Sequence, residues 1–491
     1  MPANATDLPP PPTPRAPDPG SPRAERTAWL LTIILGIAIV FIQQVGVSSK
    51  TTAKQAPPAP DAPLVNSFDP TLLTGKIIVK ISSLVPPHQR GDLATNLDPS
   101  AASVEQGVVL VPIIAELRGK DAALELIDQI RKRDGASTVT ADLDLLHTIY
   151  TSTPSALPPE ARAQLQRRLG WAGDLALTSD LPQTDPARAA IFANASGLIV
   201  FLISIGLGIL GAFLAGCAVL LYWLLAYTSG RSTPRLPRPA PGGSVGIETV
   251  ALFMACFLAL KLLSLAMGEL FVGNLTGPAA DAAEHRLTIT VMILQWVILP
   301  IVLFWPTIRG LQQPDARKAL GLHRGNGLIK EIAAGFLGYL ACFPLLIAGA
   351  IVSVLLMFAW QIIQKALGGT PPNAPANPLL DYFEQGPTLL ILLATLAVVW
   401  APIVEEVVFR GGLLRQLYTR NNIILAAIIS SIVFAFMHGY PIIMLGSIIG
   451  LAMGLAMLRW FRGSLISCIT AHAIHNALVS ALLFTLVKLL G

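Results

Sequence analysis

Long apolar runs separated by short polar segments dominate this chain, and they repeat at the length that one crossing of a lipid bilayer requires. A transmembrane helix needs about 20 consecutive, mainly apolar residues. This criterion predicts nine crossings, at residues 28–46, 192–227, 246–270, 288–307, 332–363, 387–418, 423–440, 441–458 and 464–487. The pattern therefore predicts an all-α fold, a polytopic transmembrane helix bundle of eight or nine spans.

The segment between the first two runs has a different pattern. It opens with a Pro/Ala-rich linker at residues 55–63 and continues with amphipathic stretches at residues 104–118, 122–132, 141–150 and 159–169. Apolar residues that recur with helical periodicity indicate helices with one buried face. We therefore expect a small helical soluble domain inserted after the first span, and we find no motif in it that carries chemistry.

These patterns divide the chain into five parts. The first apolar run is not followed by the small-residue cleavage site of a secretory signal, so we interpret it as an uncleaved anchor. We expect a disordered Pro-rich N-terminus at residues 1–27, the membrane anchor helix at 28–46, an extracytoplasmic helical domain with its linker at 47–190, transmembrane helices at 191–384, and a separate transmembrane core at 385–491.

Arginine and lysine residues cluster in alternate loops of this arrangement. They follow the second, fourth and eighth runs, whereas the loops after the third, fifth and seventh runs are acidic or neutral, with Asp381 and Glu384 after the fifth. Short cytoplasmic loops of membrane proteins carry an excess of positive charge. We therefore expect an integral membrane protein of the bacterial inner (plasma) membrane, with a cytoplasmic N-terminus and residues 47–190 outside the cytoplasm.

The composition agrees with this arrangement. Charged residues make up 13% of the chain and hydrophobic residues 53%, whereas an average soluble domain contains about 25% charged residues. This balance excludes an ordinary cytosolic enzyme, a disordered protein and a nucleic-acid-binding protein. The expected partner is the lipid bilayer, and no nucleic acid is expected.

Glycines in the eighth run lie on one helix face. Gly446, Gly450 and Gly454 recur every four residues, and small residues at this spacing let two transmembrane helices approach closely. We interpret this face as a helix-packing surface rather than the lining of a pore.

Ionisable residues are scarce in the C-terminal third of the chain. After Glu384 the only acidic residues are Glu405 and Glu406, and three of the seven histidines follow them, namely His438, His472 and His475. An ionisable side chain in the middle of a span costs at least about 2.5–3.5 kcal/mol, so its presence indicates a function.

Helical spacing separates these residues into pairs. Glu406 and Arg410 are four residues apart, so they share a helix face and can pair, while Glu405 lies about 100° away from Glu406. His472 and Asn476 share a face in the same way. If spans six and seven form a hairpin that turns near residues 420–422, Glu405 and His438 both lie about 24 Å from the turn and are level in the membrane.

A carboxylate beside an imidazole can take a proton from water and make the water a nucleophile. A second imidazole with a carboxamide can hold the oxyanion that forms when this water attacks an amide carbonyl. Glu405, His438 and His472 are also suited, as one oxygen and two nitrogen ligands, to bind a divalent metal such as zinc. The sequence does not decide between the two, although the His-Glu-x-x-His helix of common zinc proteases is absent.

Three short motifs carry these residues in order on separate expected spans. They are Glu405-Glu406-Val-Val-Phe-Arg410, of the form Glu-Glu-x-x-x-Arg, then Phe434-Ala-Phe-Met-His438, of the form Phe-x-x-x-His, and His472-Ala-Ile-His-Asn476, of the form His-x-x-x-Asn. Together they resemble the CAAX protease and bacteriocin-processing family, which groups type II prenyl-protein endopeptidases with abortive-infection-like proteins. The resemblance covers residues 380–491 by motif and does not extend to residues 1–190.

The resemblance implies a glutamate-dependent intramembrane endopeptidase, and hence a membrane-associated protein or peptide substrate as its partner. Its pattern makes Glu405 and His438 the water-activating pair, and His472 with Asn476 the oxyanion site. Three further residues are expected to support them: Glu406, Arg410 and His475. The family is often called a metalloprotease, but its motifs also suit a mechanism that requires no metal or other cofactor, and we favour that mechanism.

Two other functions stay open. A proton-coupled transporter also uses buried glutamate and histidine residues, although the inverted repeats of many transporters are not evident here because these residues are confined to the C-terminal half. A catalytically silent scaffold would bind partners through residues 47–190 and keep the three motifs only for folding.

Overall fold

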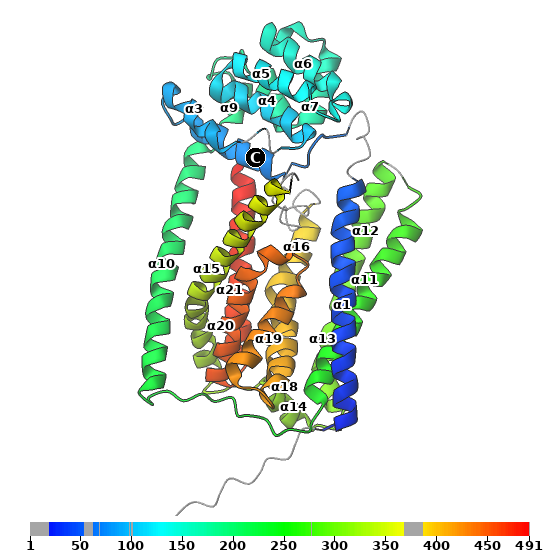
Figure 1. Ribbon diagram of the computed structural model, residues 1–491, viewed down its shortest axis with the longest axis vertical. Coiled ribbons are helices and arrows are strands. Elements are labelled where there is room, and N and C mark those ends of the chain that lie inside the picture. Colours follow the sequence, from blue (N-terminus) through cyan, green and yellow to red (C-terminus); the bar gives the residue numbers. More distant parts are fainter. Residues whose placement is uncertain are drawn as a thin grey trace, which may run out of the picture. The chain divides into compact units, whose positions relative to one another are not determined.

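The computed structural model describes residues 19–53, 62–67, 69–97, 99, 102–275, 277–367 and 386–490. The regular structure of these residues is helical and includes no strand, which confirms the expected all-α fold. The chain forms two compact units (Figure 1), one of residues 1–45, 212–356 and 388–478 and the other of residues 46–211, 357–387 and 479–491. The expected linker up to residue 61, together with Asp381 and Glu384, lies outside the described residues.

The long helices identify an integral membrane protein. Within the described residues, seven helical stretches are long and apolar enough to cross a membrane. They are built from α1 (Pro22–Ala53), α10 (Ala195–Thr228), α11 (Val245–Phe271), α12 (Pro278–Gln295) with α13 (Ile298–Ile308), α15 (Leu328–Ala366), the helix from α16 (Pro387–Thr395) to α18 (Leu414–Tyr418), and α21 (Ile466–Leu490). A short helix, α14 (Gln313–Leu320), connects α13 to α15.

Two of the nine expected crossings are short helices. In place of full spans at residues 423–440 and 441–458, α19 (Ile423–Phe436) has 14 residues and α20 (Gly446–Arg462) has 17. α19 ends close to Gly439, whose φ of +69° is incompatible with a continuing helix. A helix of 14 residues is about 21 Å long, which is less than the bilayer core of about 30 Å. The nine expected crossings therefore correspond to seven long stretches and two short helices.

The first helix begins earlier than the apolar pattern predicts. We expect disorder up to residue 27, but α1 starts at Pro22. The hydroxyl of Ser21 accepts a hydrogen bond from the N–H of Ala24 at 3.1 Å, and proline is favoured in a first helical turn, where its missing N–H would have no partner. Residues 22–27 are therefore helical, and residues 1–18 lie outside the described part of the chain.

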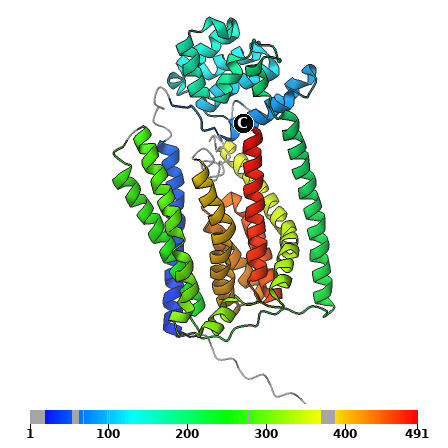
Figure 2. The ribbon, with the colours of Figure 1, turned by 180° about the vertical axis from the view of Figure 1, so that it is seen from behind.

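The glycine face of α20 packs against α15. A Cβ atom added to Gly450 would collide with the carbonyl oxygen of Leu345, and one added to Gly446 would collide with that of Gly349. At Gly454 the added atom would meet the side chain of Cys342. These contacts confirm the interpretation of the glycine repeat as a close packing surface, and α15 runs beside α20 and α21 in both views (Figures 1 and 2).

The second unit contains the inserted helical domain. Its helices are α2 (Pro70–Ser82), α3 (Arg90–Leu93), α4 (Val104–Arg118), α5 (Lys120–Arg131), α6 (Thr140–Thr151), α7 (Pro159–Leu169), α8 (Trp171–Leu177) and α9 (Pro186–Ile191). α4 to α7 lie at or close to the four stretches that the periodicity predicts.

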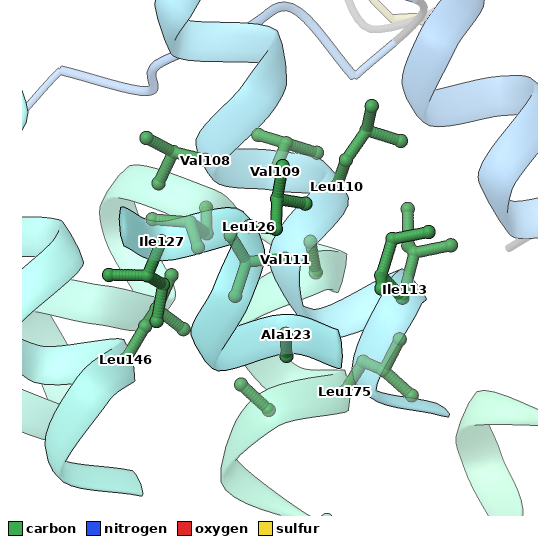
Figure 3. Close-up of a cluster of buried hydrophobic side chains, with 14 of the residues drawn as sticks. Val108, Val109, Leu110, Val111, Ile113, Ala123, Leu126, Ile127, Leu146 and Leu175 are labelled. Carbon is green, nitrogen blue, oxygen red and sulfur yellow. The ribbon is translucent and has the colours of Figure 1, made fainter. Parts of the chain in front are cut away.

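The domain has a core of its own around α4. Val108, Val109 and Val111 are completely buried, and side chains of α5, α6 and α8 surround them (Figure 3). A buried ion pair joins α6 to α7, in which Nε of Arg168 donates to Oδ1 of Asp142 at 2.7 Å. An independent core of this kind is what a separately folding domain requires.

Candidate active site

The two acidic residues of the first motif lie in a helix that changes between α-helical and π-helical turns. From α16 it continues through the π-helical η6 (Leu396–Trp400), α17 (Ala401–Glu405) and the π-helical η7 (Glu406–Leu413) to α18. π-helical turns are rare in proteins and frequently occur at functional sites. Glu405 ends α17 and Glu406 begins η7, so the pair lies where the helix type changes.

Glu406 is the centre of a buried polar network. Its Oε1 accepts hydrogen bonds from Nη1 of Arg410 at 2.9 Å and from Nδ1 of His472 at 3.0 Å. The side chains of Glu406 and Arg410 are 0% and 1% exposed. Nη2 of Arg410 also donates to the carbonyl of Ala452 at 3.1 Å, and its guanidinium lies 4.4 Å from the ring centre of Phe434. The spacing of Glu406 and Arg410 thus correctly predicts their ion pair.

His472 lies between the two glutamates. Because a carboxylate accepts hydrogen bonds, the Nδ1 atom of His472 that faces Glu406 carries a proton. Its other ring nitrogen, Nε2, is 3.9 Å from Oε2 of Glu405, which is too long for a direct hydrogen bond. Among the described residues Oε2 of Glu405 has no hydrogen-bond partner.

Glu405 and His438 line one cavity of about 70 Å³. The Glu405 side chain is 18% exposed, unlike that of Glu406. A water molecule in the liquid takes up about 30 Å³, so the cavity has room for about two. The remaining walls are largely aromatic, formed by Phe253, Phe257, Gln295, Trp400, Phe409 and Met437. Two residues that hairpin geometry predicts to be level therefore face the same small space.

The second motif orients its own histidine. Nδ1 of His438 lies 2.9 Å from the carbonyl oxygen of Phe434. A carbonyl oxygen only accepts, so Nδ1 is the donor, and a neutral ring has its lone pair on Nε2. The Phe434 ring packs against the imidazole with 4.7 Å between ring centres. Phe434 thus holds His438 through both its backbone and its side chain.

The third motif contacts the helix of the first motif at two separate positions along that helix. His472 meets Glu406, whereas Nδ2 of Asn476 donates to the carbonyl of Ala397 in η6 at 2.7 Å. His475 lies apart from both contacts. Its ring centre is 5.9 Å from that of Tyr339, and within the described part of the chain its Nδ1 has no hydrogen-bond partner.

The residues considered as metal ligands do not form a ready metal site. One nitrogen of His472 is engaged by Glu406, and the other is 3.9 Å from Glu405. Across the described ranges, no group of three or more His, Cys, Asp or Glu side chains is arranged to hold a metal ion. Glu405, His438 and His472 therefore do not form such a group in the described part of the chain.

Helix α1 contributes contacts that the sequence pattern does not reveal. Nε2 of Gln43 donates to the carbonyl of Met437, beside His438, at 3.1 Å. Earlier in α1, the buried carboxylate of Glu25 accepts hydrogen bonds from Gln416 at 3.1 Å and from Arg420 at 2.8 Å. Glu25 precedes the expected span at residues 28–46 and Gln43 lies near its end, where polar residues are ordinary in an anchor helix. α1 is instead packed against the helices that carry the motifs.

Two lining residues of the cavity were also not expected from the sequence. Trp400 precedes Glu405 on the same helix, and Gln295 ends α12. Neither belongs to a motif, and a tryptophan in an apolar run is an ordinary packing or interface residue. Only the folded arrangement identifies them as neighbours of the candidate catalytic pair.

Comparison with known proteins finds a family match for the helices that carry the three motifs. Residues 387–489 match the family model described as type II CAAX prenyl endopeptidase Rce1-like. No curated protein and no solved structure matches the chain. The matched segment begins with α16, ends in α21 and contains all three motifs, which supports an intramembrane endopeptidase of the CAAX-protease type. This match confirms the resemblance that the motifs indicate: the C-terminal core, residues 387–489, is similar to Rce1-like type II CAAX prenyl endopeptidases.

Proposed function

We propose that the protein is an intramembrane endopeptidase that hydrolyses a peptide bond of a membrane-associated protein with a water molecule activated by Glu405 and His438. The observation that supports this most directly is the shared cavity. Two side chains that are 33 residues apart in the sequence, one carboxylate and one imidazole, line the same small space among aromatic walls.

The proposed reaction begins with this water. Oε2 of Glu405 has no hydrogen-bond partner among the described residues, and Glu405 accepts one proton of the water molecule. The lone pair on Nε2 of His438 accepts a hydrogen bond from the other hydrogen of the same water. The water oxygen then attacks the carbonyl carbon of the scissile bond. When the C–N bond breaks, the proton held by Glu405 passes to the leaving nitrogen, so the glutamate is regenerated.

His472 and Asn476 are proposed to stabilise the oxyanion of this reaction. Nδ1 of His472 already donates to Glu406, so Nε2 is a donor toward the space beside Glu405 only when the ring is protonated on both nitrogens. The oxyanion role is therefore proposed for this cationic form of His472. The Asn476 amide has two N–H groups, and the one not engaged by Ala397 is the donor proposed here. Removal of a single oxyanion donor typically costs about 100- to 1,000-fold in kcat.

The function is tested by comparing the N-termini of membrane proteins from cells that carry wild-type protein, Glu405→Gln or His438→Ala. We expect a set of new N-termini that is present with wild-type protein and absent with both variants. Glu284→Gln is the matched control, because Glu284 is an exposed carboxylate of α12, and it should leave the set unchanged. Proteolysis that persists in Glu405→Gln and His438→Ala would contradict the proposal, and loss of solute uptake without any change in N-termini would favour a transporter.

The proposed topology has a cytoplasmic N-terminus and residues 47–190 outside the cytoplasm of a bacterial inner membrane. A cysteine at the exposed Ser137 of the helical domain should react with a membrane-impermeant maleimide added to intact spheroplasts. A cysteine at the exposed Arg231, in the loop after α10, should react only after lysis. The reverse labelling would overturn this orientation.

A further inference from the structure

A proline interrupts the π-helical hydrogen bonds three residues before Glu405. In η6 the N–H of Ala401 reaches back five residues and donates to the carbonyl of Leu396. The next N–H in this series would be that of residue 402, and its acceptor would be the carbonyl of Ala397. Residue 402 is a proline and has no N–H. The series therefore stops with the carbonyl of Ala397 lacking its helical donor.

Another helix supplies the missing donor. Nδ2 of Asn476, in α21, donates to the carbonyl oxygen of Ala397 at 2.7 Å. This hydrogen bond is part-buried and lies in an apolar helix, where a carbonyl without a partner is costly, so it replaces the one that Pro402 cannot make. It joins the third motif to the helix of the first motif at a point about two turns before Glu405 and Glu406.

The contact also has a geometric consequence. A π-helical turn contains one residue more than an α-helical turn, and each residue rotates the following side chains by about 100°. The direction in which Glu405 leaves the helix thus depends on whether the π-helical turn at η6 is kept. α21 makes a second contact with the same helix through His472 and Glu406. His472 and Asn476 are four residues apart, so the two contacts together fix both the position and the rotation of the helix that carries Glu405.

We infer that Asn476 is a positioning residue, which replaces the backbone N–H that Pro402 lacks and so holds the π-helical turn that directs Glu405 toward the cavity. This deepens the proposed function and rests on it for its effect on activity. Its effect on the helix does not depend on the reaction. The second N–H of the Asn476 amide stays available for the oxyanion, and the experiment below separates the two roles.

The test is a double-mutant cycle of Asn476→Ala and Pro402→Ala. Alanine at position 402 restores a backbone N–H in register with the carbonyl of Ala397. We expect Asn476→Ala to lower kcat by at least ten-fold and to lower the melting temperature of the detergent-purified protein. In the Pro402→Ala background the same asparagine change should lower the melting temperature by less than half as much, and part of the kcat should return. Asn476→Leu, which fills the space without a donor, serves as a second variant if the alanine variant folds poorly.

The outcomes distinguish this inference from a purely catalytic role. If removing Asn476 lowers kcat and melting temperature as much in the Pro402→Ala background as in the wild-type background, the inference is overturned and only an oxyanion role is left. Hydrogen exchange of the peptide that spans residues 396–405 gives a readout without substrate, because protection should fall in Asn476→Ala and recover in the double variant. If Glu405→Gln is fully active, the proposed function fails, but the exchange and melting data still decide whether Asn476 holds the helix.

Discussion

Replacing Glu406 by leucine is expected to destabilise the protein strongly. The change removes the acceptor of two hydrogen bonds, from Arg410 at 2.9 Å and from His472 at 3.0 Å. It leaves the charge of Arg410 unpaired in a side chain that is 1% exposed. Breaking a buried ion pair by removing one partner costs about 3–5 kcal/mol. Arg410 keeps the Ala452 carbonyl and the Phe434 ring as neighbours, so we expect a loss near the lower limit, about 3 kcal/mol.

The control for this prediction is the double variant Glu406→Leu with Arg410→Met. Replacing both members of a buried pair by apolar residues is often nearly neutral, so the double variant should regain most of the stability. Stability is measured from the unfolding midpoint of purified protein in a denaturing-detergent titration. A single variant within about 1 kcal/mol of wild type, or a double variant less stable than the single one, would refute the reasoning.

Activity should respond differently from stability in this series. In both variants the Nδ1 N–H of His472 loses the Glu406 oxygen that accepts its hydrogen bond, and nothing in the double variant replaces that acceptor. We therefore expect peptidase activity to stay low in the double variant although its stability returns. Recovery of both together would mean that Glu406 acts only through Arg410.

The remaining predictions concern packing, the first helix, pH and metal. Gly450→Val should destabilise the protein by about 1–3 kcal/mol because its side chain collides with α15, while the control Gly206→Val, which meets no atom within 4 Å, should leave the unfolding midpoint unchanged. Gln43→Leu removes the donor beside His438, and a hydrogen bond of about 1 kcal/mol corresponds to about a five-fold loss of activity in a peptide-cleavage assay; full activity would contradict a role for α1. Burial, and secondly the nearby charge of an arginine, lowers the pKa of His323 below its usual 6.5. The unfolded chain therefore binds a proton more readily than the folded one, and stability should fall as the pH drops below 6.5. The melting temperature of His323→Gln should fall less than that of wild type between pH 8 and pH 5, and an equal fall in both proteins would contradict this explanation. Wild-type activity should persist after dialysis against a chelator, and loss that is restored by zinc would require a metal in the mechanism.

The motifs and their spacing were sufficient to predict the Glu406–Arg410 pair. Both residues lie on one helix, and residues four apart share a face over a single turn. Counting residues in a hairpin predicted that Glu405 and His438 lie level, since depth along a helix is proportional to residue number, but only the structure shows that they line one cavity. The glycine repeat of α20 predicted its packing against another helix in the same way, although it did not identify α15 as that helix.

Contacts that depend on helix rotation could not be predicted in this way. No sequence pattern indicates that Asn476 meets Ala397 or that Nδ1 of His472 is engaged by Glu406 rather than Glu405. Ala397 lies in the π-helical η6 and Glu406 follows it, and a residue inserted in such a turn rotates the side chains after it by about 100°. Nor does any local pattern indicate that Gln43, almost 400 residues away in the sequence, lies beside His438.

Sequence by itself determined the properties that arise from local chemistry: apolar runs of bilayer length, the helices of the inserted domain, and the scarcity of charge that makes Glu405, Glu406 and the C-terminal histidines conspicuous. Hydrophobicity and periodicity are sums over neighbouring residues, so they can be read directly from the chain. Only the tertiary structure decided which atoms of separate helices meet, that α1 packs against the site, and that α19 is short. Such contacts depend on the rotation and offset of whole helices, which many weak interactions set together and which no single stretch of sequence encodes.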